Sequence, residues 1–269
     1  MFTKITLENF RSFDHIELDL TEKGNTAKHL AILYGENGAG KSNLMSAFVL
    51  LPELTRTMDA RAAYERILAQ GAIFQDENME KEMREHIRQR LRDMSAIIKD
   101  YQMADCENPI IAEYEFNIDG NNGCYRVEFG QDEILHERLE FVLNRRRGLY
   151  FDCSATGINI NDSIVEKEQG KEFLTDVKEM AKRYWGKHSL LAILIYEMKD
   201  KSNSFGRDNI TENFNVVLNE FRNLSCTVSM GDKSWEGLHA QLKVLNQPLS
   251  GKISLKREHE LDQDRKSVV

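Results

Sequence analysis

The chain has few cysteines and few prolines, and each shortage excludes a class of protein. Its four cysteines are Cys106, Cys124, Cys153 and Cys226, which form no CxxC pair and stand beside no histidine cluster. A disulfide framework and a zinc site are therefore disfavoured, and free thiols suit a reducing compartment. Only 3 prolines and 16 glycines among 269 residues argue against long disordered linkers.

Membrane and secretion signals are also missing. The longest apolar run, "LLAILIY" (Leu190 to Tyr196), is far shorter than the roughly 18 residues that a membrane span needs. The first residues, "MFTKITLENF", lack the basic region and apolar run of a signal peptide. We therefore expect a cytoplasmic protein with no membrane partner.

The chain has no excess of positive charge. It carries 36 Lys and Arg against 44 Asp and Glu, for a net charge of -8. Such a surface does not favour nucleic-acid binding, although a local basic patch is compatible with it. The one compact basic cluster is "NRRRG", with Arg145, Arg146 and Arg147. These side chains can contact DNA phosphates, but the net charge favours a solvated loop.

The rest of the composition is that of a soluble globular protein, with 41% hydrophobic and 30% charged residues. The length allows one large domain or two small ones. Apolar residues alternate with polar ones in "FTKITLENF" and "HIELDL", whereas "HLAILYG" is almost entirely apolar. This pattern predicts two half-exposed strands followed by one buried strand. A helix is expected from Lys41 to about Leu51, and Pro52 follows its predicted end.

The middle of the chain predicts a helical segment and then a sheet. Residues 57–105 are expected to be helical, with a narrow apolar stripe that fits either a projecting arm or a helix packed on the body. "AEYEFNIDGNNGCYRVEFG" (Ala112 to Gly130) predicts a hairpin, because alternation stops at a turn sequence and then resumes. "ILHERLEFVLN" and "GLYFDC" are expected to continue this sheet.

Helical spacing returns between residues 164 and 224. Three helices are expected, in "KEFLTDVKEMAKRYW", in "HSLLAILIYEMKDK" with Ser189 as its N-cap, and around Ile210 to Leu224. "KISLKREHEL" near the end is expected to start a strand. The chain has no internal repeat.

The stretch "GENGAGKS" matches the phosphate-binding pattern G-x-x-x-x-G-K-S. Its glycines permit a backbone that turns successive N–H groups toward an anion, and the helix that follows adds a partial positive charge. Lys41 can reach the β- and γ-phosphates of a nucleotide, and the Ser42 hydroxyl can bind Mg²⁺. The candidate nucleotide-binding residues are Gly35, Glu36, Asn37, Gly38, Ala39, Gly40, Lys41, Ser42 and Asn43, with Lys41 as the catalytic candidate.

Together, "ITLENFRSF" and "LYGENGAGKSNLMSAF" resemble the N-terminal lobe of ABC-type ATPases of the RecF, SMC and OLD kind. The resemblance is specific over residues 1–50 and only architectural from 107 to 225. It implies an α/β P-loop NTPase fold with antiparallel hairpins and a helical insertion, and it places Arg11 near the nucleotide. It also implies ATP and Mg²⁺ as ligands, a head-to-head homodimer, and contact with DNA or with a nuclease effector of the kind found in bacterial anti-phage defence.

The resemblance also suggests an order of parts along the chain. We expect a P-loop lobe at 1–56, a helical insertion at 57–106, a β-hairpin part at 107–160, a helical subdomain at 161–247 and the start of a C-terminal lobe at 248–269.

Two parts that such an ATPase needs are not found in the sequence. Hydrolysis requires an Asp for Mg²⁺ and a neighbouring Glu at the end of an apolar strand. In "LLAILIYEMKD" Tyr196 stands where the Asp should be, before Glu197, and the composition favours a helix. "PLSGKI" matches the family's signature motif only weakly and fits a turn better. Two explanations stay open: a fragment without its C-terminal lobe, which the length favours, or a divergent protein that binds ATP without turning it over efficiently.

Three functions follow as hypotheses. The first is an ATP-binding lobe whose closure regulates DNA handling or a nuclease partner. The second is a structural or regulatory module that ATP orders, with the helices 75–103 and 164–224 as a partner surface. The third is direct DNA binding through the basic cluster. A kinase is less favoured, because no site for an acceptor substrate is visible in the sequence.

Overall fold

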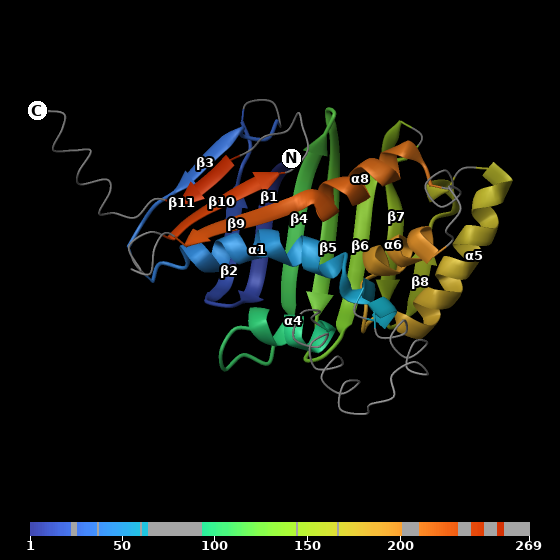
Figure 1. The fold of residues 1–269 in the computed structure, drawn as a ribbon, viewed down its shortest axis with the longest axis horizontal. Coiled ribbons are helices and arrows are strands. Elements are labelled where there is room, and N and C mark those ends of the chain that lie inside the picture. The colour runs from blue at the N-terminus through green and yellow to red at the C-terminus, as the bar shows by residue number, and fades with distance from the viewer. Residues whose placement is uncertain are drawn as a thin grey trace, which may run out of the picture.

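A seven-stranded antiparallel sheet forms the frame of the protein in the computed structural model (Figure 1). The structure describes residues 1–22, 26–36, 38–59, 61–63, 93–143, 145–165, 167–200, 210–230, 238–244 and 252–255. The strand order is β2-β1-β4-β5-β6-β7-β8. These strands are β1 (Phe2–Phe10), β2 (Phe13–Asp19), β4 (Ile110–Ile118), β5 (Asn121–Phe129), β6 (Ile134–Leu143), β7 (Arg146–Ser154) and β8 (Gly157–Ile160).

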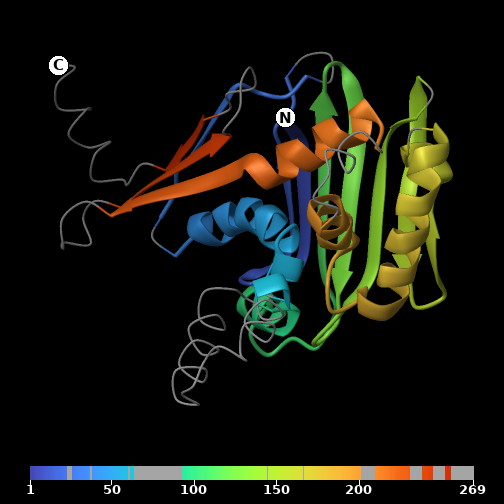
Figure 2. The same cartoon turned by 45° about the vertical axis from the view of Figure 1, so that its right-hand side comes forward.

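One face of this sheet is apolar and covered by helices, and the other is polar. In β4 every second residue is buried, including Tyr114 and Phe116, whereas Glu113 and Glu115 point to the other face. Figures 1 and 2 show the helices lying along one side of the sheet. They are α1 (Lys41–Leu54), α5 (Lys167–Tyr184), α6 (Leu190–Asp200) and α8 (Glu212–Asn223), while α4 (Met94–Tyr101) lies at one end of the strands and a short 3-10 helix spans Asp162–Ile164.

The hairpin predicted from Ala112 to Gly130 is confirmed as β4 and β5. Its turn contains Asp119 at φ 51° and Gly120 at φ 80°, as the two central residues of a type I′ turn require. The predicted continuation of the sheet is confirmed as β6 and β7. Alternation with period two therefore located the sheet correctly, because one of its faces is buried and the other is not.

The three helices predicted after residue 164 are confirmed as α5, α6 and α8. Ser189 caps α6 as expected: its Oγ accepts a hydrogen bond from Ala192 N at 3.0 Å. In the segment expected to be helical at 57–105, the structure describes α4 and the helical residues 57–59 and 61–63. The prediction is wrong for residues 102–105, because α4 ends at Tyr101 and a turn follows. The apolar stripe between Met79 and Leu91 lies outside the described residues.

A second, four-stranded sheet contains the strand that leads into the phosphate-binding loop. Its order is β3-β11-β10-β9, with β3 (Leu30–Leu33) parallel to β11 (Lys252–Leu255). The remaining strands are β9 (Leu224–Met230) and β10 (Leu238–Val244). The strand expected near 252 is confirmed, whereas β9 and β10, which fall within 161–247, were not predicted. "PLSG" lies outside the described residues.

The prediction that "HLAILYG" is a buried strand is wrong. Leu30, Ile32 and Tyr34 are 55%, 53% and 75% exposed. The reason is position: β3 stands at the end of its sheet, so its only neighbour among the described strands is β11. A continuous apolar run indicates a strand covered on both faces only when layers on both sides are present, and the described part of the chain covers this one on a single face.

The predicted end of the first helix near Leu51 is also wrong, because α1 continues through Pro52 to Leu54. Proline removes one backbone hydrogen bond from a helix interior and costs about 3 kcal/mol. Here Leu50, Leu51 and Leu54 on both sides of the proline are fully buried, and this burial offsets the cost. Among the described helices, none is long and apolar enough to cross a membrane.

Candidate nucleotide-binding site

The loop between β3 and α1 has the backbone that the motif predicts. Gly38 and Gly40 have φ of 90° and 82°, a region that side chains other than glycine's rarely enter. Gly40 is the N-cap of α1, and its carbonyl accepts the first helical bond, from Leu44 N at 2.9 Å. The first turn of α1 contains no acidic residue. The loop therefore ends on an unopposed positive helix terminus, which favours an anion.

Lys41 adds the strongest charge at this loop. Its Nζ donates hydrogen bonds to the carbonyl oxygens of Gly35 and Glu36, each at 2.6 Å. The ammonium group is thus held over the beginning of the loop. Ser42 is exposed on the first turn of the helix, so its hydroxyl is accessible to a metal ion. Asn37 lies outside the described residues.

The turn between β1 and β2 packs directly on the loop. Asn43 Nδ2 donates a hydrogen bond to Ser12 Oγ at 2.8 Å. The Phe13 ring lies so close to Gly40 that a Cβ there would be 2.6 Å from Phe13 Cζ. Gly40 is therefore required for its backbone angle and for its small size. The sequence resemblance includes this turn, but the sequence does not indicate that Ser12 and Phe13 contact the loop.

Arg11 belongs to the same turn and is fixed by Tyr101 at the end of α4. Its backbone N donates to Tyr101 O at 2.8 Å, and its guanidinium carbon lies 5.0 Å from the Tyr101 ring centre. Arg11 has φ 53°, an uncommon conformation for a residue with a side chain. Its Nε is buried and has no hydrogen-bond partner among the described residues. A cation with unused donor capacity thus stands one residue from Ser12.

The P-loop helix is anchored along its length by buried side chains. Tyr114 Oη donates to Ala47 O at 2.6 Å, and Ser189 Oγ donates to Leu54 O at 2.7 Å. Tyr101 Oη donates to Glu53 Oε2 at 2.9 Å. These anchors come from β4, from the start of α6 and from α4, so three elements determine where the N-terminus of α1 points.

The described part of the chain does not supply the acidic pair of a hydrolytic site next to the loop. None of the strands β9, β10 and β11 contains Asp or Glu. "LLAILIYEMKD" is the helix α6, so the strand interpretation of this segment is wrong and the helix interpretation is confirmed. No group of three His, Cys, Asp or Glu among the described residues could hold a metal ion by itself. Ser42, which the motif predicts as the Mg²⁺ ligand, is exposed at the start of α1.

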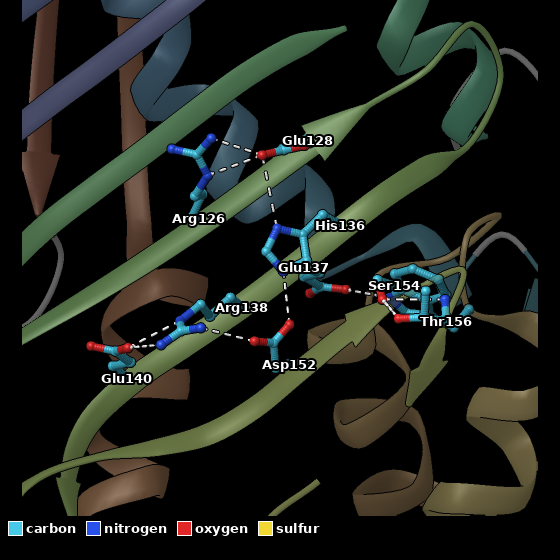
Figure 3. A network of polar contacts seen from close by, with 10 residues as sticks. Arg126, Glu128, His136, Glu137, Arg138, Glu140, Asp152, Ser154 and Thr156 are labelled. Carbon is cyan, nitrogen blue, oxygen red and sulfur yellow. Dashed lines mark hydrogen bonds and ion pairs between the residues drawn. The ribbon is translucent and has the colours of Figure 1, made fainter. Parts of the chain in front are cut away.

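The basic cluster lies on the turn between β6 and β7, where acids partly neutralise it. Arg145 has φ 67° in this turn, and Arg147 Nε pairs with Glu140 Oε2 at 2.8 Å. Figure 3 shows the polar face of the sheet nearby, where Arg138 lies between Glu140 and Asp152. Such pairing reduces the charge available to DNA phosphates.

The sheet, the covering helices and the glycine-rich loop with its lysine define a P-loop protein of the nucleotide-binding class. Comparison with protein families is more specific: residues 1–220 match the family model described as the AAA ATPase domain. The chain therefore belongs to the AAA ATPase domain family. Membership implies ATP and Mg²⁺ as ligands and ATP binding and hydrolysis as the family's activity. Among curated proteins no match is found.

Proposed function

We propose that the chain is the ATP-binding module of an ATPase of the RecF, SMC and OLD-like ABC class. The observation that carries the proposal is the loop from Gly35 to Ser42, in which Lys41 and the N-terminus of α1 converge. Family membership over residues 1–220 supports it. In this proposal the loop amides and Lys41 bind the β- and γ-phosphates, Ser42 contributes its hydroxyl to Mg²⁺, and Asn43 holds the neighbouring turn.

Arg11 is proposed as a second cation for the nucleotide. Its buried Nε has no hydrogen-bond partner among the described residues, and a phosphate or ribose oxygen of a bound nucleotide would satisfy it. The stack on Tyr101 holds the guanidinium while leaving donors free for a ligand. In this proposal Arg11 adds charge to the site from the turn between β1 and β2, whereas Lys41 adds it from α1.

At the level of the cell, we propose a homodimer whose ATP-driven closure regulates DNA handling or a nuclease effector in bacterial defence. The resemblance of residues 1–50 to RecF, SMC and OLD-like proteins supports this step. The second candidate is a module that ATP orders but that hydrolyses little or none. The acid-free strands β9, β10 and β11 beside the loop favour this alternative.

Calorimetric titration with Mg·ATP tests binding. Lys41→Ala should abolish tight binding, because it removes the cation that neutralises the phosphates. Lys182→Ala, an exposed position on α5 far along the chain, serves as the matched control and should bind like the wild type. Equal affinity in Lys41→Ala and wild type would overturn the proposal. Turnover measured in the same samples separates the two candidates: binding with no phosphate release favours the ordered module.

A further inference from the structure

Glu137 is the one acidic residue of the seven-stranded sheet whose side chain is fully buried on the helix-covered face. It is 0% exposed, and its neighbours on that face of β6 are Leu139 and Phe141. A buried carboxyl group is costly unless it is hydrogen-bonded. An acid at such a position needs a role that an apolar side chain could not fill.

The two carboxylate oxygens of Glu137 accept hydrogen bonds from residues in or next to three elements, β5, α5 and α6. Tyr125 Oη of β5 donates to Oε1 at 3.0 Å. Oε2 accepts from Trp185 Nε1, just after α5, at 3.0 Å and from Leu190 N, the first residue of α6, at 2.7 Å. Glu137 thus fixes the junction between α5 and α6 onto the sheet.

Ser189 continues this chain of contacts to the P-loop helix. Its Oγ caps α6 by accepting from Ala192 N at 3.0 Å, and the same hydroxyl donates to Leu54 O at 2.7 Å. Leu54 is the last residue of α1, whose first residue is Lys41. A buried line of hydrogen bonds therefore runs from β6 through the start of α6 to the C-terminal end of the helix that carries the nucleotide site.

We propose that Glu137 and Ser189 are positioning residues that set the P-loop helix from its C-terminal end. The inference rests on the proposed nucleotide binding for its functional meaning, but the positioning itself is a property of the free protein. The positioning effect follows because a packed helix moves as a rigid unit. Since α1 is anchored at Ala47, Glu53 and Leu54, a displacement of its last turn also displaces its first turn. The ends of α5 and α6 meet at the Glu137 carboxyl group. A partner that binds to these helices would therefore shift the P-loop through the same line of hydrogen bonds.

The bonding pattern also indicates which substitution preserves the line. In a glutamine, the carbonyl oxygen can accept from Trp185 and Leu190, and the NH₂ group can donate to Tyr125 Oη. Glu137→Gln should therefore keep the geometry. Glu137→Leu has similar bulk but leaves the donors of Trp185 and Leu190 without a partner.

The experiment compares these variants with Tyr150→Phe. Tyr150 Oη donates to Val142 O at 2.7 Å, so this control loses one hydrogen bond of a similar kind within the same sheet and away from α1. Two readouts are needed: amide hydrogen exchange of residues 41–48 without nucleotide, and the dissociation constant for Mg·ATP. Urea unfolding of every variant gives the general loss of stability.

Ser189→Ala removes a hydrogen bond made directly to α1, at Leu54 O, whereas Tyr150→Phe removes none to this helix. Ser189→Ala should therefore speed exchange in residues 41–48 by about tenfold over Tyr150→Phe and weaken ATP binding by a similar factor. Glu137→Leu removes three hydrogen bonds at the junction of α5 and α6 and should have at least as large an effect. Glu137→Gln should match the wild type in both. Exchange in Ser189→Ala no faster than in Tyr150→Phe at equal stability would overturn the inference, even if Glu137→Leu fails to fold. Because exchange needs no nucleotide, failure of the wild type to bind ATP would refute the proposed function and leave this result standing on its own.

Discussion

Gly40 is the residue that most directly determines how the phosphate-binding loop packs on the turn between β1 and β2. Gly40→Ala should lose ATP affinity, because φ 82° costs a residue with a side chain about 1–2 kcal/mol and because the new Cβ would collide with Phe13. Gly38→Ala separates these causes: its φ is 90°, yet nothing lies within 4 Å of the added carbon. Calorimetry should show the larger loss in Gly40→Ala, and Phe13→Leu in that background should recover part of it. Equal losses at both glycines would show that the collision has no effect.

Glu137 should make the stability of the protein depend on pH. Burial raises the pKa of its carboxyl group from the usual 4.5 to about 7, while its hydrogen bonds with Leu190, Trp185 and Tyr125 lower the pKa. Between these two pH values the native state binds more protons than the unfolded state, so the free energy of unfolding should fall as pH rises, by about 3 kcal/mol, and level off above pH 7. Urea unfolding across this range measures the slope.

The matched variant for this pH dependence is Glu137→Gln, which cannot titrate and should lose this part of the slope. The titratable groups that face Glu137 are Tyr125 on β5 and Cys153 on β7. Burial raises the pKa of both side chains, so neither ionises between pH 4.5 and 7 and neither can replace the missing slope. The same pH dependence in Glu137→Gln as in wild type would show that another group is responsible.

Among the elements, the turn between β1 and β2 and the start of α1 should act as one unit. Asn43→Ala and Ser12→Ala each remove the same hydrogen bond, so each should weaken ATP binding by a few-fold, within the about 0.5–1.5 kcal/mol of such a bond. The double variant should be no weaker than either single one, because the bond can be lost only once. Asn219→Ala on α8, whose bond to Asn215 is local to that helix, is the control. Additive losses would mean that the two side chains act separately.

Sequence patterns correctly predicted the strands and helices that have one buried face and one exposed face. Alternation located β4 to β7, and helical spacing located α5, α6 and α8 with Ser189 as a cap. The patterns misjudged β3 and the end of α1, because burial of β3 depends on distant strands and tolerance of Pro52 depends on the core around it. The motif predicts Gly35 to Asn43 as the nucleotide-binding residues, and this stays a prediction. The motif could not give the contacts of Ser12, Phe13 or Glu137, since these partners are far from the loop along the chain.

At the scale of the molecule, the nucleotide loop lies where the two sheets join. Helix α1 is bonded to the large sheet, where Tyr114 of β4 donates to Ala47 O, and it also contacts β9 of the small sheet. The loop from Gly35 to Gly40 joins this helix to β3, a strand of the small sheet. The match to the AAA ATPase domain ends at residue 220, before β9 begins at Leu224. The strands that complete the sheet around β3 therefore come from a part of the chain beyond the family match.

This arrangement predicts that β11 is required for nucleotide binding although it contains none of the loop residues. Ile253 is paired with Ala31 of β3 and with Leu242 of β10. Ile253→Pro should break this pairing, because proline lacks the backbone N–H and fits poorly inside a sheet. β3 would then lose its one neighbour among the described strands, and with it the fixed entry to the loop. We expect ATP affinity to fall by about tenfold or more, as the loss of strand pairing at the loop implies.

The large sheet should survive this change, since none of its strands pairs with β11 in the described structure. The cooperative urea transition should therefore persist in Ile253→Pro, and Ile253→Val, which keeps the N–H and strand preference, should bind ATP normally. Unchanged affinity in Ile253→Pro would show that β3 is positioned by the large sheet and α1 alone. Loss of both affinity and the urea transition would show instead that the two sheets fold as a single cooperative unit, with the nucleotide site at its centre.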